Sequence, residues 1–270
     1  MTGNSVFGNV AAVFFFEWKR ASTFPRMAWW AALAAFPVFI VGLFRYIVPS
    51  QPEPPEELWR VFCAWLIFAL VPMLVSMLGT LLWMTPALSA ELERRSWVYL
   101  AVRPNGSTAV LIGKYLAAIT WVIPPAMVGL SIAVPLAGTN DPWRIWLTMA
   151  GLVLLSCPAY AAIYLLLGVV MPRRAMVLAV AYTLLFELII SFVPAVINKV
   201  TVQYRLRALA ARWCDLPIFG GRESGALVLI GDEPAWIHVA TLIALTLTLL
   251  CVSVVVLRSS EFSSSAETDN

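Results

Sequence analysis

The sequence has 270 residues, of which 61% are hydrophobic and 12% charged, with a formal net charge of +3. A soluble domain is about half apolar and about a quarter charged, so this composition excludes a soluble domain. The chain also shows no basic patch in polar surroundings, which excludes a nucleic-acid-binding protein. With a mean hydropathy of +0.86, the composition predicts an all-α integral membrane protein.

Residues 1–26 are predicted to form a cytoplasmic segment that contains an amphipathic helix. Within it, Phe7, Val10, Phe14 and Trp18 recur at helical spacing, and charged residues follow toward the end of the helix. A helix of this kind lies in the membrane interface and does not cross the bilayer.

Six later stretches are apolar enough to cross a bilayer, which takes about 20 residues. The first of them is too long for the apolar part of a signal peptide, and no small-residue cleavage site follows it, so we expect it to remain in the chain. The sequence therefore predicts one transmembrane domain of six helices over residues 27–257. The six stretches are about 27–48, 61–88, 110–137, 143–171, 174–196 and 236–257.

Lysine and arginine residues gather on one side of these spans, and the side rich in them is usually cytoplasmic. With the N-terminus inside, ten of them lie in short inner segments and three in short outer loops. Six spans return the chain to its starting side, so we expect both termini in the cytoplasm. The polar tail 258–270 is expected to be a disordered cytoplasmic segment.

The predicted outer loop, residues 197–235, is the largest segment outside the spans. It carries five further basic residues, which weakens the charge contrast without reversing it. Its first half predicts an interfacial helix with Arg205, Arg207 and Arg212 directed toward lipid headgroups.

No motif for catalysis or metal binding is found in the sequence. The stretch GSTAVLIGKY departs from a phosphate-binding loop, which has four residues between its glycines and Ser or Thr after the lysine. Here six residues separate Gly106 from Gly113, and Tyr115 follows Lys114. Four scattered cysteines and one histidine do not predict a zinc or haem site. We therefore expect no enzyme activity and no bound cofactor in this chain.

Glu187 is an acidic residue in the middle of a predicted span. A carboxylate at this depth is costly and often marks a transport pathway. Several interpretations stay open. Glu187 lines a pathway, carries a proton or pairs with a basic group across a helix interface, or it is protonated or hydrogen-bonded and helps the helices to pack.

The stretch ELERRSWVYLAVRPNG, residues 91–106, interrupts the apolar spans with charges. Its apolar residues recur near helical spacing, and its charged residues can face water. This pattern predicts a short helix on the inner membrane surface. Pro104 and the following Asn-Gly end this helix, because Pro and Gly break helices. A simpler interpretation is an interfacial loop anchored by its arginines.

The longer stretch of residues 91–114, ELERRSWVYLAVRPNGSTAVLIGK, resembles the cytoplasmic loop of ABC-2-type transporter permeases, the membrane subunits of one class of ATP-binding-cassette (ABC) exporters. That loop has acidic and basic residues, then Thr or Ser, a Leu-rich run, a Pro and a later Gly-Lys. The helical segment before the first span also fits the family loosely, with Glu17 followed by basic residues. The matching positions of the loop are Glu91, Glu93, Ser96, Leu100, Pro104, Gly113 and Lys114.

The chain departs from the family pattern at two places. Arg95 stands where the family usually has Gly, and Asn105-Gly106-Ser107 stands where it usually has Ser-Arg after the Pro.

The resemblance implies a function for the predicted inner helix. It would be a cytoplasmic coupling helix between the second and third spans, seated in a groove of a separate ATPase subunit and contacting it through Glu91, Glu93, Arg94, Arg95, Ser96, Leu100 and Pro104. Gly113 and Lys114 would mark the end of the coupling loop.

The resemblance also implies partners. The chain would form a homo- or heterodimer with a second permease subunit, in contact with membrane lipid. Two copies of the ABC ATPase would bind this dimer, and ATP and magnesium would be bound by those ATPases. Such a complex would lie in a bacterial cytoplasmic (inner) membrane and export a substrate, which the sequence does not identify.

Two other functions remain open at this stage. One is a membrane scaffold subunit of a larger complex that transports nothing. The other is a secondary transporter driven by an ion gradient, which needs several polar sites at broken helices inside the membrane.

Overall fold

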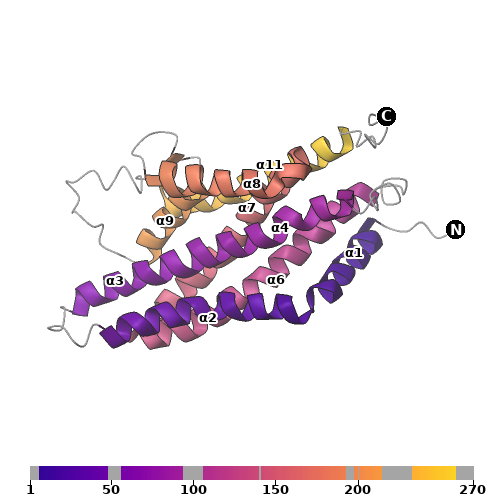
Figure 1. Cartoon of the computed structure of the whole chain (residues 1–270). Coiled ribbons are helices and arrows are strands. Elements are labelled where there is room, and N and C mark those ends of the chain that lie inside the picture. The colour runs from indigo at the N-terminus through magenta and orange to yellow at the C-terminus, as the bar shows by residue number, and fades with distance from the viewer. Residues whose placement is uncertain are drawn as a thin grey trace.

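The computed structural model describes residues 6–47, 56–93, 106–139, 141–192, 198–199, 201–214 and 233–259. Throughout these ranges the regular elements are helices, and none of the described residues forms a strand. Long helices run side by side along the molecule (Figure 1). The all-α architecture predicted from the composition is therefore confirmed.

The chain begins with helix α1 (Val6–Ala21) and helix α2 (Phe24–Ile47). A two-residue break separates them, and the Met27 amide donates to the carbonyl of Thr23 at 2.9 Å. In Figure 1, α1 continues the line of α2 at an angle. The amphipathic segment and the first apolar span are thus two distinct helices, as the sequence predicts.

The second predicted span is one helical run made of α3 (Glu56–Phe68), the π-helix η2 (Ala69–Val75) and α4 (Ser76–Glu93). Pro72 lies inside η2. Proline lacks an N–H and clashes with a carbonyl of the preceding turn, and a π-helical turn absorbs both effects. The Ser76 hydroxyl donates to the Val71 carbonyl at 3.2 Å, which satisfies one of the carbonyls in this turn.

Helices α6 (Gly106–Ala137) and α7 (Pro142–Val170) form the centre of the bundle. Helix α6 packs against α1, α2, α4 and α7, while α7 also packs against α4 and α11. Close packing of α2 on α6 depends on Gly129, because a Cβ at this position would lie 2.8 Å from the Ala34 carbonyl oxygen. Small residues that allow such close approach are typical of helix contacts in membranes.

The fifth predicted span, residues 174–196, has an irregular structure. After the short turn η3 (Pro172–Arg174) come α8 (Ala175–Tyr182), the π-helix η4 (Thr183–Ile189) and the turn η5 (Ile190–Phe192). Helix α8 packs against α4 and α7. None of these elements alone is long enough to cross a bilayer, so a sixth span remains a prediction.

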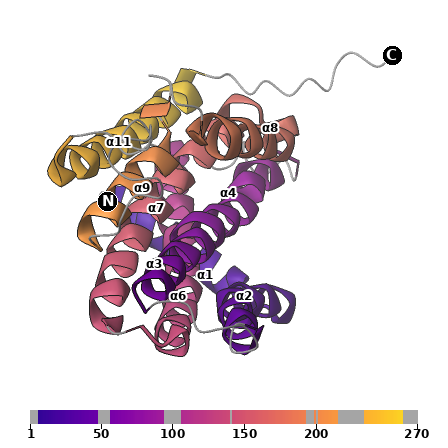
Figure 2. The same cartoon turned by 90° about the vertical axis from the view of Figure 1, so that its left-hand side faces the viewer.

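Helix α9 (Val202–Trp213) forms in the predicted outer loop, and α11 (Ala235–Ser259) ends the described chain. Helix α9 packs against α7 and α11, and Figure 2 shows it beside both. The expected direction of Arg207 toward headgroups is wrong, since Arg207 is only 8% exposed. Its guanidinium donates to the Ser191 carbonyl at 3.2 Å, inside the bundle.

Among the described residues, five helical segments are long and apolar enough to cross a membrane. Four of them begin and end within three residues of a span predicted from the sequence. The segment that begins at Gly106 starts four residues before its predicted span and ends at the predicted residue. The first residues of α1 and the last residues of α11 lie toward the same end of the bundle (Figure 1). The five segments are Phe24–Ile47, Leu58–Ala87, Gly106–Ala137, Pro142–Val170 and Ala235–Ser259.

Candidate functional site

The start of α6 follows directly on the charged segment that the sequence singles out. Two other helices are fastened to it. On one side it contacts α1, and on the other side the Arg258 guanidinium, at the end of α11, donates to the Thr108 hydroxyl at 3.0 and 3.2 Å. The first turns of α6 thus join the two ends of the described chain.

Gly113 allows α1 to lie directly on α6. A Cβ at this position would lie 2.8 Å from both Cβ and Cγ1 of Val13 and 3.2 Å from the carbonyl oxygen of Val10. Because real Cβ atoms do not approach other atoms so closely, any larger residue would push α1 away. The glycine of the predicted Gly-Lys pair therefore has a packing role here.

Lys114 makes an ion pair with α1. Its ammonium Nζ lies 2.7 Å from Oε1 of Glu17, and the Lys114 side chain is only 5% exposed. The same carboxylate oxygen lies 3.8 Å from the guanidinium of Arg20, one turn later on α1. A charged hydrogen bond with little exposure to water is stronger than one at the surface, so this pair fixes α1 against α6.

Aromatic side chains extend the contact between α1 and α6. The Trp18 indole N–H donates to the Thr120 hydroxyl at 2.9 Å, and its ring lies 5.2 Å from that of Trp121. Trp121 in turn stacks on Trp83 of α4, also at 5.2 Å. These rings connect α1, α6 and α4 at one level of the bundle.

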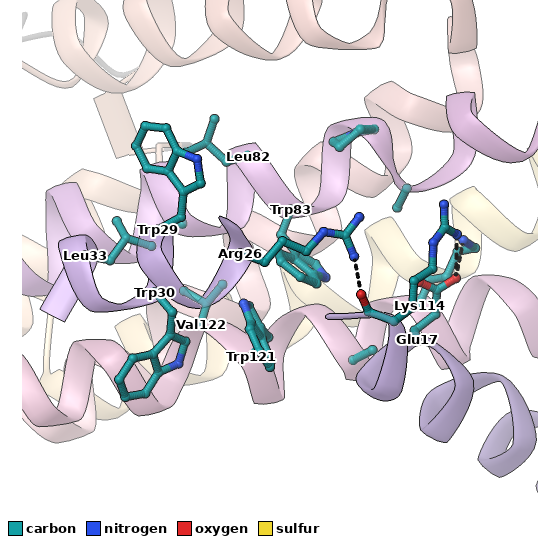
Figure 3. A pocket seen from close by; sticks show the side chains of 15 residues that line it. Glu17, Arg26, Trp29, Trp30, Leu33, Leu82, Trp83, Lys114, Trp121 and Val122 are labelled. Carbon is teal, nitrogen blue, oxygen red and sulfur yellow. Dashed lines mark hydrogen bonds and ion pairs between the residues drawn. The ribbon is translucent and has the colours of Figure 1, made fainter. Parts of the chain in front are cut away.

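A cavity of about 350 Å³ lies where α1, α2, α4 and α6 meet (Figure 3). Charged side chains line one end of it and apolar ones the rest. Figure 3 shows Glu17 beside Lys114 at the charged end, with Trp29 and Trp30 of α2 at the other end. The lining residues are Glu17, Arg20, Arg26, Trp29, Trp30, Leu33, Gly79, Leu82, Trp83, Pro86, Ala87, Lys114, Ala117, Trp121 and Val122.

Glu187 lies in η4 and is fully buried. Its Oε1 accepts hydrogen bonds from the Tyr182 hydroxyl at 2.7 Å and the Val202 amide at 3.3 Å. Its Oε2 accepts from the Gln203 amide at 3.0 Å and the Tyr160 hydroxyl at 3.3 Å. The carboxylate is thus held by four donors.

Two of those donors belong to the first turn of α9. The first amides of a helix have no partner within the helix, and their partial positive charge favours a carboxylate. The Thr201 hydroxyl accepts a third hydrogen bond, from the Tyr204 amide at 3.2 Å. Glu187 and Thr201 together therefore cap α9 and hold it inside the bundle.

The structure places the other predicted site residues as follows. Glu91 and Glu93 lie in the last turn of α4. Gly113 and Lys114 lie in α6 and meet α1. Glu187 lies in a separate cluster with α9. Outside the described residues lie Arg94, Arg95, Ser96, Leu100 and Pro104.

Sequence reasoning missed the partners of these residues. The Glu17–Lys114 pair joins residues 97 positions apart, and no local pattern predicts such a contact. One signal was present in the sequence: both residues match the family pattern, Glu17 before the first span and Lys114 at the end of the matching stretch 91–114. The capping of α9 by Glu187 left no comparable signal in the sequence.

Comparison with known proteins assigns no family. The sequence matches no family model and no curated protein.

Proposed function

We propose that the chain is the permease subunit of an ABC exporter, driven by a separate ATPase subunit through residues 91–105. The observation that carries this proposal is the position of the two helix ends that flank the charged segment in the chain. The end of α4 and the start of α6 lie at the same end of the bundle as the beginning of α1 and the end of α11 (Figure 1). The family resemblance of this segment supports the same function.

The contacts of α6 give the proposal a mechanical basis. A push on residues 94–105 acts directly on α4 and α6. Because Lys114 binds α1 and Thr108 binds Arg258 of α11, a movement of the start of α6 also moves those two helices. Switching of this kind, in which packed helices move as rigid bodies, is common in transport and signalling proteins.

The proposed complex contains two permease subunits and two ATPase subunits in a bacterial cytoplasmic membrane, with both termini of the chain in the cytoplasm. ATP and magnesium are bound by the ATPases, and this chain supplies no catalytic group. Closure of the two ATPases on ATP would move the two segments 91–105 together and switch access to a path between the permeases. Glu187 is a candidate residue of that path as well as a cap of α9.

Charge reversal tests the docking role of the segment. We expect the double variant Arg94→Glu/Arg95→Glu to lose its co-purifying ATPase subunit and its ATP-driven transport. The matched control is Arg173→Glu/Arg174→Glu, which makes the same change of charge in the exposed turn between α7 and α8. Retention of the ATPase by the first variant, or its loss from both, would contradict docking at residues 91–105 and favour a scaffold subunit.

A further inference from the structure

The cavity between α1, α2, α4 and α6 combines cations with an apolar wall. Three basic side chains and one carboxylate lie at its charged end: Arg20, Arg26, Lys114 and Glu17. Glu17 makes ion pairs with Lys114 and Arg20, and neither pair involves Arg26.

Arg26 lies in the first turn of α2. One guanidinium nitrogen donates to the Arg20 carbonyl at 3.0 Å, and Cζ lies 5.1 Å from the centre of the Trp83 ring. Within the described part of the chain, no carboxylate lies at ion-pair distance from Arg26. A guanidinium has five N–H donors, so those not used here can bind the oxygen atoms of an anion.

The apolar part of the cavity opens to the side of the bundle. Trp29 of α2 and Leu82 of α4 line it and are 66% and 44% exposed. Both helices belong to segments apolar enough to cross a membrane. In a bilayer, this opening therefore faces lipid acyl chains. Figure 3 shows Trp29, Leu33 and Leu82 on one side of the Arg26 guanidinium and the Glu17–Lys114 pair on the other.

We propose that this cavity binds one anionic phospholipid, with its phosphate group at Arg26 and part of an acyl chain along Trp29, Leu33 and Leu82. Its volume of about 350 Å³ is at the lower end of the range for ligand sites, which suits a headgroup and part of a chain. Basic sites between membrane helices commonly select anionic headgroups, and tryptophan favours the level of the headgroups. This site depends on no ATPase and lies outside residues 91–105.

A direct test measures lipid binding to the full chain. The protein is purified, stripped of lipid in detergent and titrated with phosphatidylglycerol or with phosphatidylcholine of identical chains, and bound lipids are counted by native mass spectrometry. Both lipids carry the phosphate, but only phosphatidylcholine carries a choline ammonium, which the basic side chains at the charged end of the cavity repel. We therefore expect one phosphatidylglycerol to bind about tenfold more tightly than phosphatidylcholine, a difference of about 1.4 kcal/mol. Equal affinity for the two lipids would overturn the proposal.

Variants of arginine locate the site. We expect Arg26→Gln to abolish the preference for phosphatidylglycerol and Arg26→Lys to keep part of it. Arg45→Gln is the matched control, because Arg45 is an exposed arginine at the opposite end of the same helix. If Arg45→Gln weakens binding as much as Arg26→Gln does, the lipid binds elsewhere and the proposal fails.

A second pair of variants tests the apolar wall without touching a charge. Leu82→Trp fills the opening and should weaken phosphatidylglycerol binding, whereas Leu78→Trp, one turn earlier on α4 and outside the cavity, should leave it unchanged. This pair keeps the test decisive if Arg26→Gln fails to fold. Inorganic phosphate in large excess should not displace the lipid; if it does, the site binds free phosphate and the lipid proposal is wrong.

Discussion

The ammonium of Lys114 lies 2.7 Å from a carboxylate oxygen of Glu17, and this contact fastens α1 to the start of α6. Glu17 lies in the predicted amphipathic segment, and Lys114 is the last residue of the stretch 91–114, whose sequence resembles a loop of ABC-2-type permeases. Two parts of the sequence that support the same resemblance therefore meet in the structure. The pair also lines the cavity for which we propose an anionic lipid.

Removal of one member of this pair should destabilise the protein. In Lys114→Ala the Glu17 carboxylate loses its nearest buried partner, which we expect to lower the free energy of unfolding by about 1–3 kcal/mol. Thermal unfolding in detergent measures the change. Lys19→Ala is the control, because Lys19 is exposed on the same helix as Glu17, and such surface changes stay within about 0.5 kcal/mol.

A double-mutant cycle shows whether the two side chains act together. The cost of Glu17→Gln combined with Lys114→Ala should be clearly smaller than the sum of the two single costs. Strict additivity would mean that the contact contributes nothing to stability.

Gly113 should tolerate no larger residue. A Cβ at this position meets Val13 at 2.8 Å, so Gly113→Val forces α1 away from α6 at a cost of about 1–3 kcal/mol. The loss should be partly restored by Val13→Ala in the same chain. In contrast, a Cβ at Gly151 meets only the Trp213 ring at 3.5 Å, an ordinary contact. Gly151→Ala should therefore leave the unfolding temperature unchanged or raise it, since alanine favours helices.

Substitutions at Glu187 should follow a definite order. Glu187→Ala leaves two hydroxyls and two amides of the α9 turn without their acceptor and should cost the most. Glu187→Gln keeps one carbonyl acceptor and should cost less, and Tyr182→Phe, which removes one donor, should cost about 1 kcal/mol. Unfolding temperatures of the purified variants check the order. If Glu187→Ala is as stable as the wild type, the capping of α9 by Glu187 is wrong.

The ion pairs of Glu233 give a prediction for pH. Hydrogen bonds from Arg205 and Lys199 lower the pKa of Glu233 below its usual value of 4.5. A carboxyl group whose pKa is lower in the folded state than in the unfolded state stabilises the fold at any pH above its unfolded-state pKa. This stabilisation is lost as the pH falls through the folded-state pKa. The wild type should therefore be more stable than Glu233→Gln by about 0.5 kcal/mol at pH 7, typical of a pair near the surface.

The same comparison at lower pH gives the check. The difference between wild type and Glu233→Gln should vary little from pH 8 to about pH 5 and then vanish in acid. When Arg205→Gln is added to both proteins, their difference in stability should depend less on pH, because the Arg205 guanidinium is the nearer partner of Glu233 at 2.6 Å. A difference that grows in acid would contradict the sign of the pKa shift.

Local patterns in the sequence predicted a large part of the fold. Runs of apolar residues have the length of a membrane helix, so α2 and α11 were located to within three residues. The helical spacing of Phe7, Val10 and Phe14 likewise predicted α1. These elements depend on properties of neighbouring residues, which a sequence displays directly.

Features that depend on distant contacts could not be predicted in this way. The burial of Arg207 follows from the position of α9 between α7 and α11, and the periodicity of α9 alone does not reveal it. The π-helix around Glu187 and the cap that Glu187 provides for α9 require two segments to meet in space. Of the candidate site, the sequence predicted the residues Gly113 and Lys114 but not their contact with α1.

The subunits that accompany the chain test the central claim most directly. The protein should be purified gently from its native membrane, and the stoichiometry of everything that co-purifies measured by quantitative mass spectrometry. A permease of the proposed kind should retain an ATP-binding-cassette ATPase in near-equal amount to itself. Recovery of the intact chain with no ATP-binding subunit would contradict the account.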